Sequence, residues 1–267
     1  MFDFLQNLDN DIRDGLLIQL RNLWTHTSTA IEGNTLTLGE TAFVLEEGLT
    51  ISGKPLKDHE EVVGHARAID LVYNFIRSGA DLTENDLFDL HKAVQTKRIM
   101  DVYKPVGAWK AEPNSTVIVS GNDQVIFEYT PPKDVPELMQ GWLILFQNTC
   151  KGKVLTREEA LTAYVCLHVS FVRIHPFWDG NGRMARLIAN VPVIRAGLAP
   201  IIIPKERRQE YIAALSEYHL AVGSATAGSE LLPEVDKLDR FKRFCDEAWS
   251  ESIKLMDEAH KKQQERN

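Results

Sequence analysis

A proline and a run of turn-forming residues separate two helical patterns in SFVRIHPFWDGNGRMARL, residues 170–187. Proline disfavours helical geometry in the residue before it, so the first helix is expected to end near His175. The DGNG run at 179–182 suits positive backbone φ angles, which aim successive N–H groups into one concavity. A second helix is expected from about Arg183. The segment therefore predicts two helices joined by a tight turn that can hold an anion.

Most of the remaining chain also has apolar residues at helical spacing, which predicts an all-α fold. The expected helices cover 11–24, 58–79, 83–95, 135–150, 156–174 and 206–222, with a last helix from 238 that frays into the charged end. Thr83 is a candidate N-cap, and Pro192 should kink or end the helix that follows the turn. One segment differs, because two β-rich runs, Thr116–Ser120 and Gln124–Tyr129, flank SGND and predict a small hairpin.

Composition excludes several classes of protein. The chain has 267 residues, 44% of them apolar, which is enough for a substantial core. A net charge of −8 argues against nucleic-acid binding through a broad basic surface. No apolar run is long enough for a membrane span, and the first residues do not resemble a signal peptide. The three cysteines, Cys150, Cys166 and Cys245, have no metal-type spacing, so we expect reduced thiols in a cytoplasmic protein.

Two patterns imitate functional sites. GLTISGKP, residues 48–55, nearly spells a phosphate-binding P-loop, but Pro55 replaces the Mg²⁺-binding hydroxyl and no strand precedes it. A connecting loop is the expected structure. His168 lies seven residues before His175, yet it belongs to the apolar stripe of its helix and is expected to be a packed, hydrogen-bonded histidine. A catalytic zinc ion usually has three protein ligands, and no HExxH motif or close equivalent supplies them.

The turn at 179–182 also concentrates residues suited to phosphate chemistry. Arg183 and Arg186 are neighbours on one helix face, and both can form forked hydrogen bonds with phosphate oxygens. The helix N-terminus adds a partial positive charge. Asp179 supplies a hard oxygen ligand for Mg²⁺, and His175 titrates near neutral pH, as a general base should. These roles together predict phosphoryl or nucleotidyl transfer to a hydroxyl group.

HPFWDGNGRMAR, residues 175–186, resembles the Fic family motif HxFx(D/E)GNGRxxR at every defined position. The helical organisation, the hairpin before the motif and ERRQEYIAAL after it are similar to that family as well. The resemblance implies a Fic-fold helical bundle with a β-hairpin flap. It also implies an adenylyltransferase that moves AMP from ATP to a protein hydroxyl and releases pyrophosphate.

The resemblance implies a role for each motif position. His175 would deprotonate the target Ser, Thr or Tyr, and Asp179 would hold Mg²⁺ or Mn²⁺. The phosphates would be bound by Gly180, Asn181, Gly182, Arg183 and Arg186, with Tyr211 near the adenine. Glycine at 182, where Doc-type relatives carry lysine, points to nucleotide transfer. The flap residues Thr116, Val117, Ile118 and Val119 would pair with the target by strand addition.

TSTAIEGNTL, residues 27–36, places Ser28 and Glu32 on one side of a helical turn, with Gly33 suited to a left-handed cap. Beside a Fic motif, this pattern resembles the family's inhibitory helix, (S/T)xxxE(G/N). The resemblance implies that Glu32 pairs with Arg186 and keeps it from the γ-phosphate. ATP would then bind with its α-phosphate out of line for attack.

The expected organisation has three parts: an N-terminal helical region at 1–60 with the inhibitory helix at about 22–33, a Fic core at 61–223 and a C-terminal segment at 224–267. Other interpretations remain open. The alternatives are a Fic enzyme that uses another nucleotide donor or removes AMP from proteins, and a module that binds nucleotide without catalysis. A metal hydrolase built on His168, His175 and Asp179 is a further alternative. Fic proteins often self-associate, so the resemblance also implies a homo-oligomer.

Overall fold

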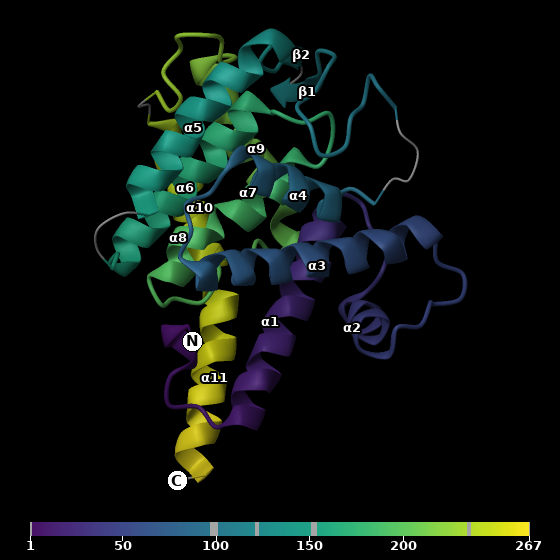
Figure 1. Cartoon of the computed structure of the whole chain (residues 1–267), viewed down its shortest axis with the longest axis vertical. Coiled ribbons are helices and arrows are strands. Elements are labelled where there is room, and N and C mark those ends of the chain that lie inside the picture. Colours follow the sequence, from purple (N-terminus) through teal and green to yellow (C-terminus); the bar gives the residue numbers. More distant parts are fainter. Residues whose placement is uncertain (1, 97–100, 121–122, 151–153, 234–235, 267) are drawn as a thin grey trace.

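The computed structural model describes residues 2–96, 101–120, 123–150, 154–233 and 236–266. Helices dominate it, and the described part contains one two-stranded sheet, so the expected all-α fold with a hairpin is confirmed (Figure 1). The helices are α1 (Asn10–Ile31), α2 (Leu38–Glu47), α3 (Leu56–Ser78), α4 (Glu84–Val94), α5 (Val135–Cys150), α6 (Arg157–Ile174), α7 (Asn181–Ile188), α8 (Asn190–Arg195), α9 (Arg208–Val222), α10 (Lys237–Ala248) and α11 (Ser250–Arg266). The strands are β1 (Ser115–Ser120) and β2 (Asp123–Glu128), and short 3₁₀ turns cover Asp3–Leu5, Pro132–Asp134 and Lys205–Arg207.

Local sequence signals fix several helix ends. Thr83 and Asp86 form a capping box at the start of α4, which confirms the predicted N-cap. Thr156 and Glu159 do the same for α6. Pro192 lacks an N–H group and its ring clashes with the carbonyl four residues earlier, at Ile188. This is where α7 ends, and the chain continues after Ala189 as α8.

The helix α6 forms the centre of the core. From Leu167 to Ile174 every residue of α6 is buried, and the helix packs against α5, α7, α8 and α10. Trp142 of α5 donates a hydrogen bond from its indole nitrogen to Ser170 Oγ over 3.1 Å, so even the polar groups of this interface are paired. Because α6 leads directly into the motif turn, the turn starts from the buried core of the molecule.

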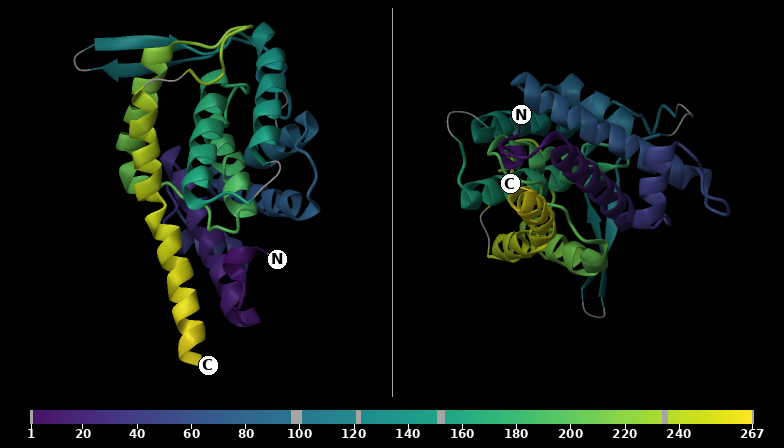
Figure 2. Two further views of the ribbon diagram at one scale, coloured as in Figure 1. Left: turned by 90° about the vertical axis from the view of Figure 1, so that its left-hand side faces the viewer. Right: turned by 90° about the horizontal axis from the view of Figure 1, so that it is seen from below.

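The hairpin pairs Val117 with Ile126 and Ile118 with Val125 in an antiparallel register. It lies at the end of the molecule opposite the C-terminus (Figures 1 and 2). Ile118 and Phe127 are buried against the body, whereas Val117 and Ile126 are exposed on the outer face. The predicted flap residues therefore do not share one environment.

The helices run across the expected divisions of the chain. Residues 22–31 of the expected inhibitory helix form the second half of α1, which begins at Asn10, and Glu32 and Gly33 follow its end. The expected division at residue 60 falls inside α3. The single C-terminal helix that was expected is two helices, α10 and α11, separated at Trp249. The buried Trp249 indole donates to the Ala199 carbonyl over 2.8 Å. The second of these helices, α11, lies beside α1, and both project from the helical body (Figures 1 and 2).

Candidate active site

The motif turn is held closed by its own side chains. The helix α6 ends at Ile174, and His175 adopts a left-handed conformation with φ of 54° rather than the extended one that a following proline favours. Asn181 accepts a hydrogen bond from the Phe177 N–H over 2.9 Å and donates one to the Phe177 carbonyl over 2.8 Å. Both polar groups of the Asn181 side chain are thus used to close the turn. The next helix begins at Asn181, two residues earlier than predicted.

His91 of α4 supports the turn from outside. Its Nδ1 accepts a hydrogen bond from the Gly107 N–H over 2.9 Å, so Nε2 carries the proton and donates to the Asp179 carbonyl over 3.0 Å. The ring stacks on Phe177 with centroids 3.8 Å apart. Burial lowers the pKa of His91 to about 4, so the imidazole stays neutral. No local pattern indicates this contact, which joins residues 88 positions apart.

His175 lies between the turn and the hairpin. Its Nδ1 lies 3.3 Å from the Val172 carbonyl, which leaves Nε2 as the atom able to accept a proton. The ring stacks on Tyr129, directly after β2, with centroids 3.7 Å apart. Burial, reinforced by the nearby Lys110 ammonium, lowers the pKa of His175 to about 3. The imidazole is therefore neutral over the physiological pH range and available as a base.

Asp179 and Arg183 lie on the open side of the turn. The Asp179 carboxylate is half exposed, and its Oδ1 accepts a 2.7 Å hydrogen bond from the Gly180 N–H. Arg183 donates from Nη1 to the Val94 carbonyl at the end of α4, and its Nη2 lies 4.0 Å from Asp179 Oδ1. One accessible carboxylate beside a helix N-terminus fits a Mg²⁺ ion that substrate phosphates also hold.

Arg186 is buried and contacts four acceptors. Its guanidinium donates to Ser28 Oγ over 3.0 Å, to the Ser28 carbonyl over 2.9 Å, to Glu32 Oε1 over 2.6 Å and to the Tyr211 hydroxyl over 3.3 Å. Burial by itself would lower the pKa of Arg186, but Tyr211 and Glu32 raise it above its ordinary value. The charge is therefore permanent, and the side chain is fully engaged within the protein.

The Glu32 carboxylate lies over the first turn of α7. A Cβ atom added to Gly182 would come within 2.8 Å of Glu32 Oε1. The end of α1 that presents this carboxylate is fixed, because Arg208 donates from Nε to the Ile31 carbonyl over 2.6 Å and Gly33 adopts φ of 98°. A carboxylate thus stands next to the N–H groups and the arginine that suit a phosphate.

Tyr211 continues the Arg186 network into the core. Its hydroxyl lies 3.0 Å from His168 Nε2, and both residues are buried. His168 is therefore the packed, hydrogen-bonded histidine that was predicted. The described residues contain no cluster of three metal-type side chains, which counts against the zinc hydrolase. A place for Tyr211 near the adenine remains a prediction.

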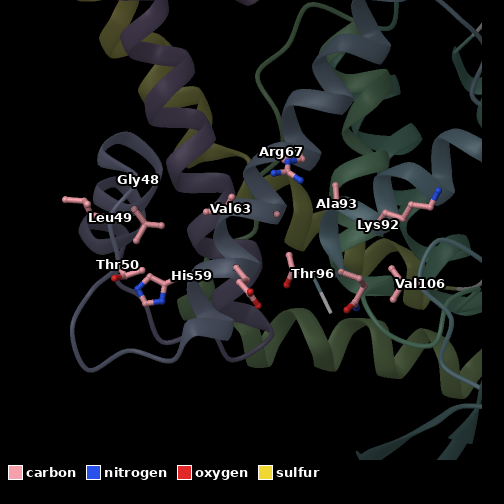
Figure 3. Close-up of a pocket in the computed structure, with 14 residues that line it drawn as sticks. Gly48, Leu49, Thr50, His59, Val63, Arg67, Lys92, Ala93, Thr96 and Val106 are labelled. Atoms are coloured by element: carbon pink, nitrogen blue, oxygen red, sulfur yellow. The ribbon is translucent and has the colours of Figure 1, made fainter. Parts of the chain in front are cut away.

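The P-loop-like segment at 48–55 is a connecting loop between α2 and α3, as predicted. Lys54 donates from Nζ to the Thr35 carbonyl over 2.6 Å. The loop lines one side of a cavity of about 580 Å³ whose other walls come from α3 and α4 (Figure 3). Gln95 lines the cavity too, and its amide nitrogen would lie 2.8 Å from a Cβ at Gly180, so the cavity lies behind the motif turn.

No helix among the described residues is both long and apolar enough to cross a membrane. The cysteines at 150, 166 and 245 are free thiols, in agreement with the sequence.

A family model, curated relatives and solved structures all relate this chain to Fic proteins. A family model described as the Fic/DOC family matches residues 81–193. The protein adenylyltransferase fic-1 of Caenorhabditis briggsae is 32% identical over 195 residues, covering 72% of this chain and 36% of the relative. The protein adenylyltransferase Fic of Drosophila melanogaster is 32% identical over 184 residues, covering 69% of this chain and 34% of the relative. The chain spans about a third of the length of these curated relatives.

Solved structures show the same fold. A Fic domain-containing signalling protein from Bacteroides thetaiotaomicron superposes with a TM-score of 0.83 at 27% identity, covering 96% of this chain and 92% of that one. A segment of Fic-1 from Caenorhabditis elegans gives a TM-score of 0.67 at 27% identity, covering 94% of this chain and 66% of that one. The similarity therefore includes the helices outside the motif.

Proposed function

The chain contains a domain of the Fic/DOC family, and on that premise we propose that it is a protein adenylyltransferase. Its substrates are ATP and a protein that presents a Ser, Thr or Tyr hydroxyl. The observation that carries the proposal is the motif turn, where a neutral imidazole, an accessible carboxylate and a helix N-terminus meet. A surface loop between two helices needs none of these groups.

In the proposed reaction His175 Nε2 accepts the proton of the target hydroxyl. The hydroxyl oxygen bonds to the α-phosphorus of ATP, and the bond to the β-phosphate oxygen breaks, which releases pyrophosphate. A base whose pKa is about 3 is weak, but the negative charge of bound ATP favours the imidazolium and raises that pKa. Substrate binding thus strengthens the base at the moment it is needed.

Phosphate binding is assigned to the first turn of α7. The backbone N–H groups at Gly180 and Gly182 and the arginines Arg183 and Arg186 supply donors and positive charge. Asp179 is the residue that would hold Mg²⁺ or Mn²⁺. The ion would neutralise phosphate charge as the bond to pyrophosphate breaks.

Glu32 is proposed to inhibit the enzyme by occupying Arg186, with Ser28 holding the same guanidinium. An arginine paired with a carboxylate cannot also grip the γ-phosphate, so ATP binds with its α-phosphate out of line. The Glu32 side chain is 41% exposed, so solvent screens the pair and keeps it reversible. The β1 residues 116–119 are proposed to pair with the target segment.

Incubation of purified Glu32→Gly protein with α-³²P-labelled ATP and Mg²⁺ tests the proposal. We expect self-labelling to rise about 10- to 100-fold over the wild type, because each 1.4 kcal/mol removed from the barrier is tenfold in rate. Adding His175→Ala should abolish the gain. If the Glu32→Gly protein binds ATP but transfers nothing, the adenylyltransferase proposal fails.

Labelling a lysate with the same variant, followed by mass spectrometry, would identify the modified protein and side chain. Parallel reactions with labelled UTP test whether the enzyme uses another nucleotide donor.

Wild-type protein added to a purified AMP-modified product tests the reverse reaction, for which Glu32 is available to orient a water molecule. A cytoplasmic location and self-association are further proposals, checked by fractionation and by light scattering.

A further inference from the structure

A buried lysine lies behind the base and outside the motif. Lys110 is only 3% exposed, and its Nζ donates to Asn114 Oδ1 over 2.6 Å. The same ammonium lies 6.0 Å from the centre of the Tyr129 ring, which stacks on His175. Burial lowers the pKa of Lys110 to about 7. Burying a lysine amine whose one side-chain hydrogen-bonding partner among the described residues is Asn114 is costly, so a structural purpose alone would favour an apolar residue here.

Asn114 joins three segments of the chain. Its side-chain Nδ2 donates to the Phe177 carbonyl in the motif turn over 3.0 Å. Its backbone carbonyl accepts a hydrogen bond over 3.1 Å from the N–H of Tyr129, which follows β2. Lys110 adds a second bond to the turn, because its backbone N–H donates to the Pro176 carbonyl over 2.9 Å. The segment 110–114 is therefore bonded to both sides of the His175 site.

These contacts connect the hairpin to the base. Tyr129 directly follows β2, so the bond from its N–H fixes the end of the hairpin. Its ring covers one face of the His175 imidazole. A shift of the hairpin would move Tyr129, and a shift of the turn would move His175, and the pair Lys110–Asn114 opposes both.

We propose that Lys110 and Asn114 are positioning residues that hold the hairpin in register with His175, so that a hydroxyl on a hairpin-bound protein segment meets Nε2. This inference rests on the proposed function. Neither side chain contacts Arg183, Arg186 or Glu32 in the described structure, so their loss should slow transfer without weakening ATP binding. A residue that only stabilised the fold would affect both.

The test uses the Glu32→Gly protein as parent. Lys110→Met removes the ammonium at similar length, and Asn114→Asp keeps the acceptor for Lys110 but removes the bond donated to Phe177. We expect each variant to lower the maximal rate of self-labelling at least tenfold, while the ATP dissociation constant from calorimetry stays within about twofold. Lys110→Arg, which keeps a cationic donor, should recover part of the rate.

Lys104 offers a matched control, because its exposed ammonium lies 5.2 Å from the Trp178 ring on the same turn. Lys104→Met should leave the labelling rate unchanged. The proposal is overturned if Lys110→Met keeps the parent rate within twofold, or if ATP affinity or melting temperature falls together with the rate.

Hydrogen exchange measures the coupling without any reaction. In Lys110→Met, peptides that cover residues 124–130 and 172–180 should both exchange faster than in the parent, because the hairpin and the turn lose their common support. Unchanged exchange in both peptides would refute the positioning role of Lys110 and Asn114. If the parent itself labels nothing, the proposed function fails, and this measurement still decides the positioning role.

Discussion

The two ends of the motif turn are held in different ways. At the base end, His175 has neutral contacts, namely the Tyr129 ring and a backbone carbonyl, and its proton-accepting atom has no competitor among them. At the arginine end, Arg186 is bonded to α1 through Ser28 and Glu32. The proposed base has no competing contact there, whereas the arginine proposed to bind phosphate already holds the Glu32 carboxylate.

Under the proposed function, this difference would place the control of activity in α1. The partners of His175 come from its own turn and from the adjacent hairpin, whereas Glu32 lies 154 residues from Arg186 in the chain. In the proposed mechanism, displacement of the Glu32 side chain would free Arg186 from its carboxylate partner and leave His175 unaffected. A small bias between two arrangements then suffices, because each 1.4 kcal/mol of differential stabilisation changes their ratio tenfold.

The largest expected effect comes from Arg186→Ala in the Glu32→Gly background. We expect the labelling rate to fall about 1000-fold, because an arginine that holds the γ-phosphate both binds the leaving pyrophosphate and keeps the α-phosphate in line for attack, which contributes several kcal/mol. In an Arg186→Ala protein, Glu32→Gly should bring no further gain. The four proteins form a double-mutant cycle, measured as self-labelling rates at saturating ATP.

Additive effects in this cycle would contradict the comparison, since Glu32 would then act on something other than Arg186. His175→Ala is the matched control. It removes the base and should lower the rate equally whether or not Glu32 is present.

Two buried histidines, one near each end of the motif turn, should contribute differently to the free energy of unfolding. His65 of α3 lies near the arginine end with no hydrogen-bonding partner among the described residues, and burial, with Arg186 and Arg183 nearby, lowers its pKa well below 6.5. His91, at the base end, has both ring nitrogens bonded. His91→Leu should lower the free energy of unfolding by about 2 kcal/mol at pH 7, since two groups lose their partners. His65→Leu should be neutral or stabilising.

The pH dependence follows from the lowered pKa values. Below pH 6.5 the unfolded chain binds a proton at each of these histidines and the folded chain does not, so stability is complete above pH 6.5 and falls as the pH decreases. The decrease in the free energy of unfolding between pH 6.5 and lower pH should be smaller in each histidine variant than in the wild type, by up to about 1.4 kcal/mol per pH unit. Urea unfolding at pH 7, 6 and 5 measures this. A His65→Leu protein as acid-sensitive as the wild type would contradict the assignment.

Local sequence patterns predicted the features that depend on a few neighbouring residues, such as helix ends. Pro176, Thr83 and Pro192 each act within a few residues, and the helix ends fall where those residues require. The sequence also indicated that Ser28 and Glu32 face one way, but only the fold shows Ser28 bonding Arg186 through both its hydroxyl and its carbonyl.

Other features depend on tertiary contacts that leave no periodic signal. Lys110 and Asn114 stand in an irregular segment, and their role depends on the Phe177 carbonyl 63 residues away. His91 occupies an ordinary helical position until α4 packs against the turn. The place of Asn181 in the turn was predicted, but the two hydrogen bonds by which its side chain closes the turn through Phe177 were not. Its phosphate-binding role remains a prediction. Burial of polar groups decides such cases, and burial is a property of the whole fold.

The smallest expected effect comes from substitution of Gly182, which lies beside Glu32 and Arg186. Gly182 is helical, so alanine there should stabilise α7 by up to about 1 kcal/mol. In the wild type the new Cβ would lie 2.8 Å from Glu32 Oε1 and 3.1 Å from Arg186 Nη1, and displacing the carboxylate should cancel the gain. Glu32→Gly removes that contact, so Gly182→Ala should be more favourable in this background by about 0.5–1 kcal/mol. Denaturant unfolding of the four proteins measures the difference.

Gly180→Ala is the control for this last measurement. Gly180 has φ of 83°, so alanine is strained there whatever residue stands at position 32. Its cost should be the same in both backgrounds. If Gly182→Ala also costs the same in both, the Glu32 carboxylate does not rest on α7 in solution. Glu32 would then act on Arg186 alone, without covering the N–H groups of the anion site.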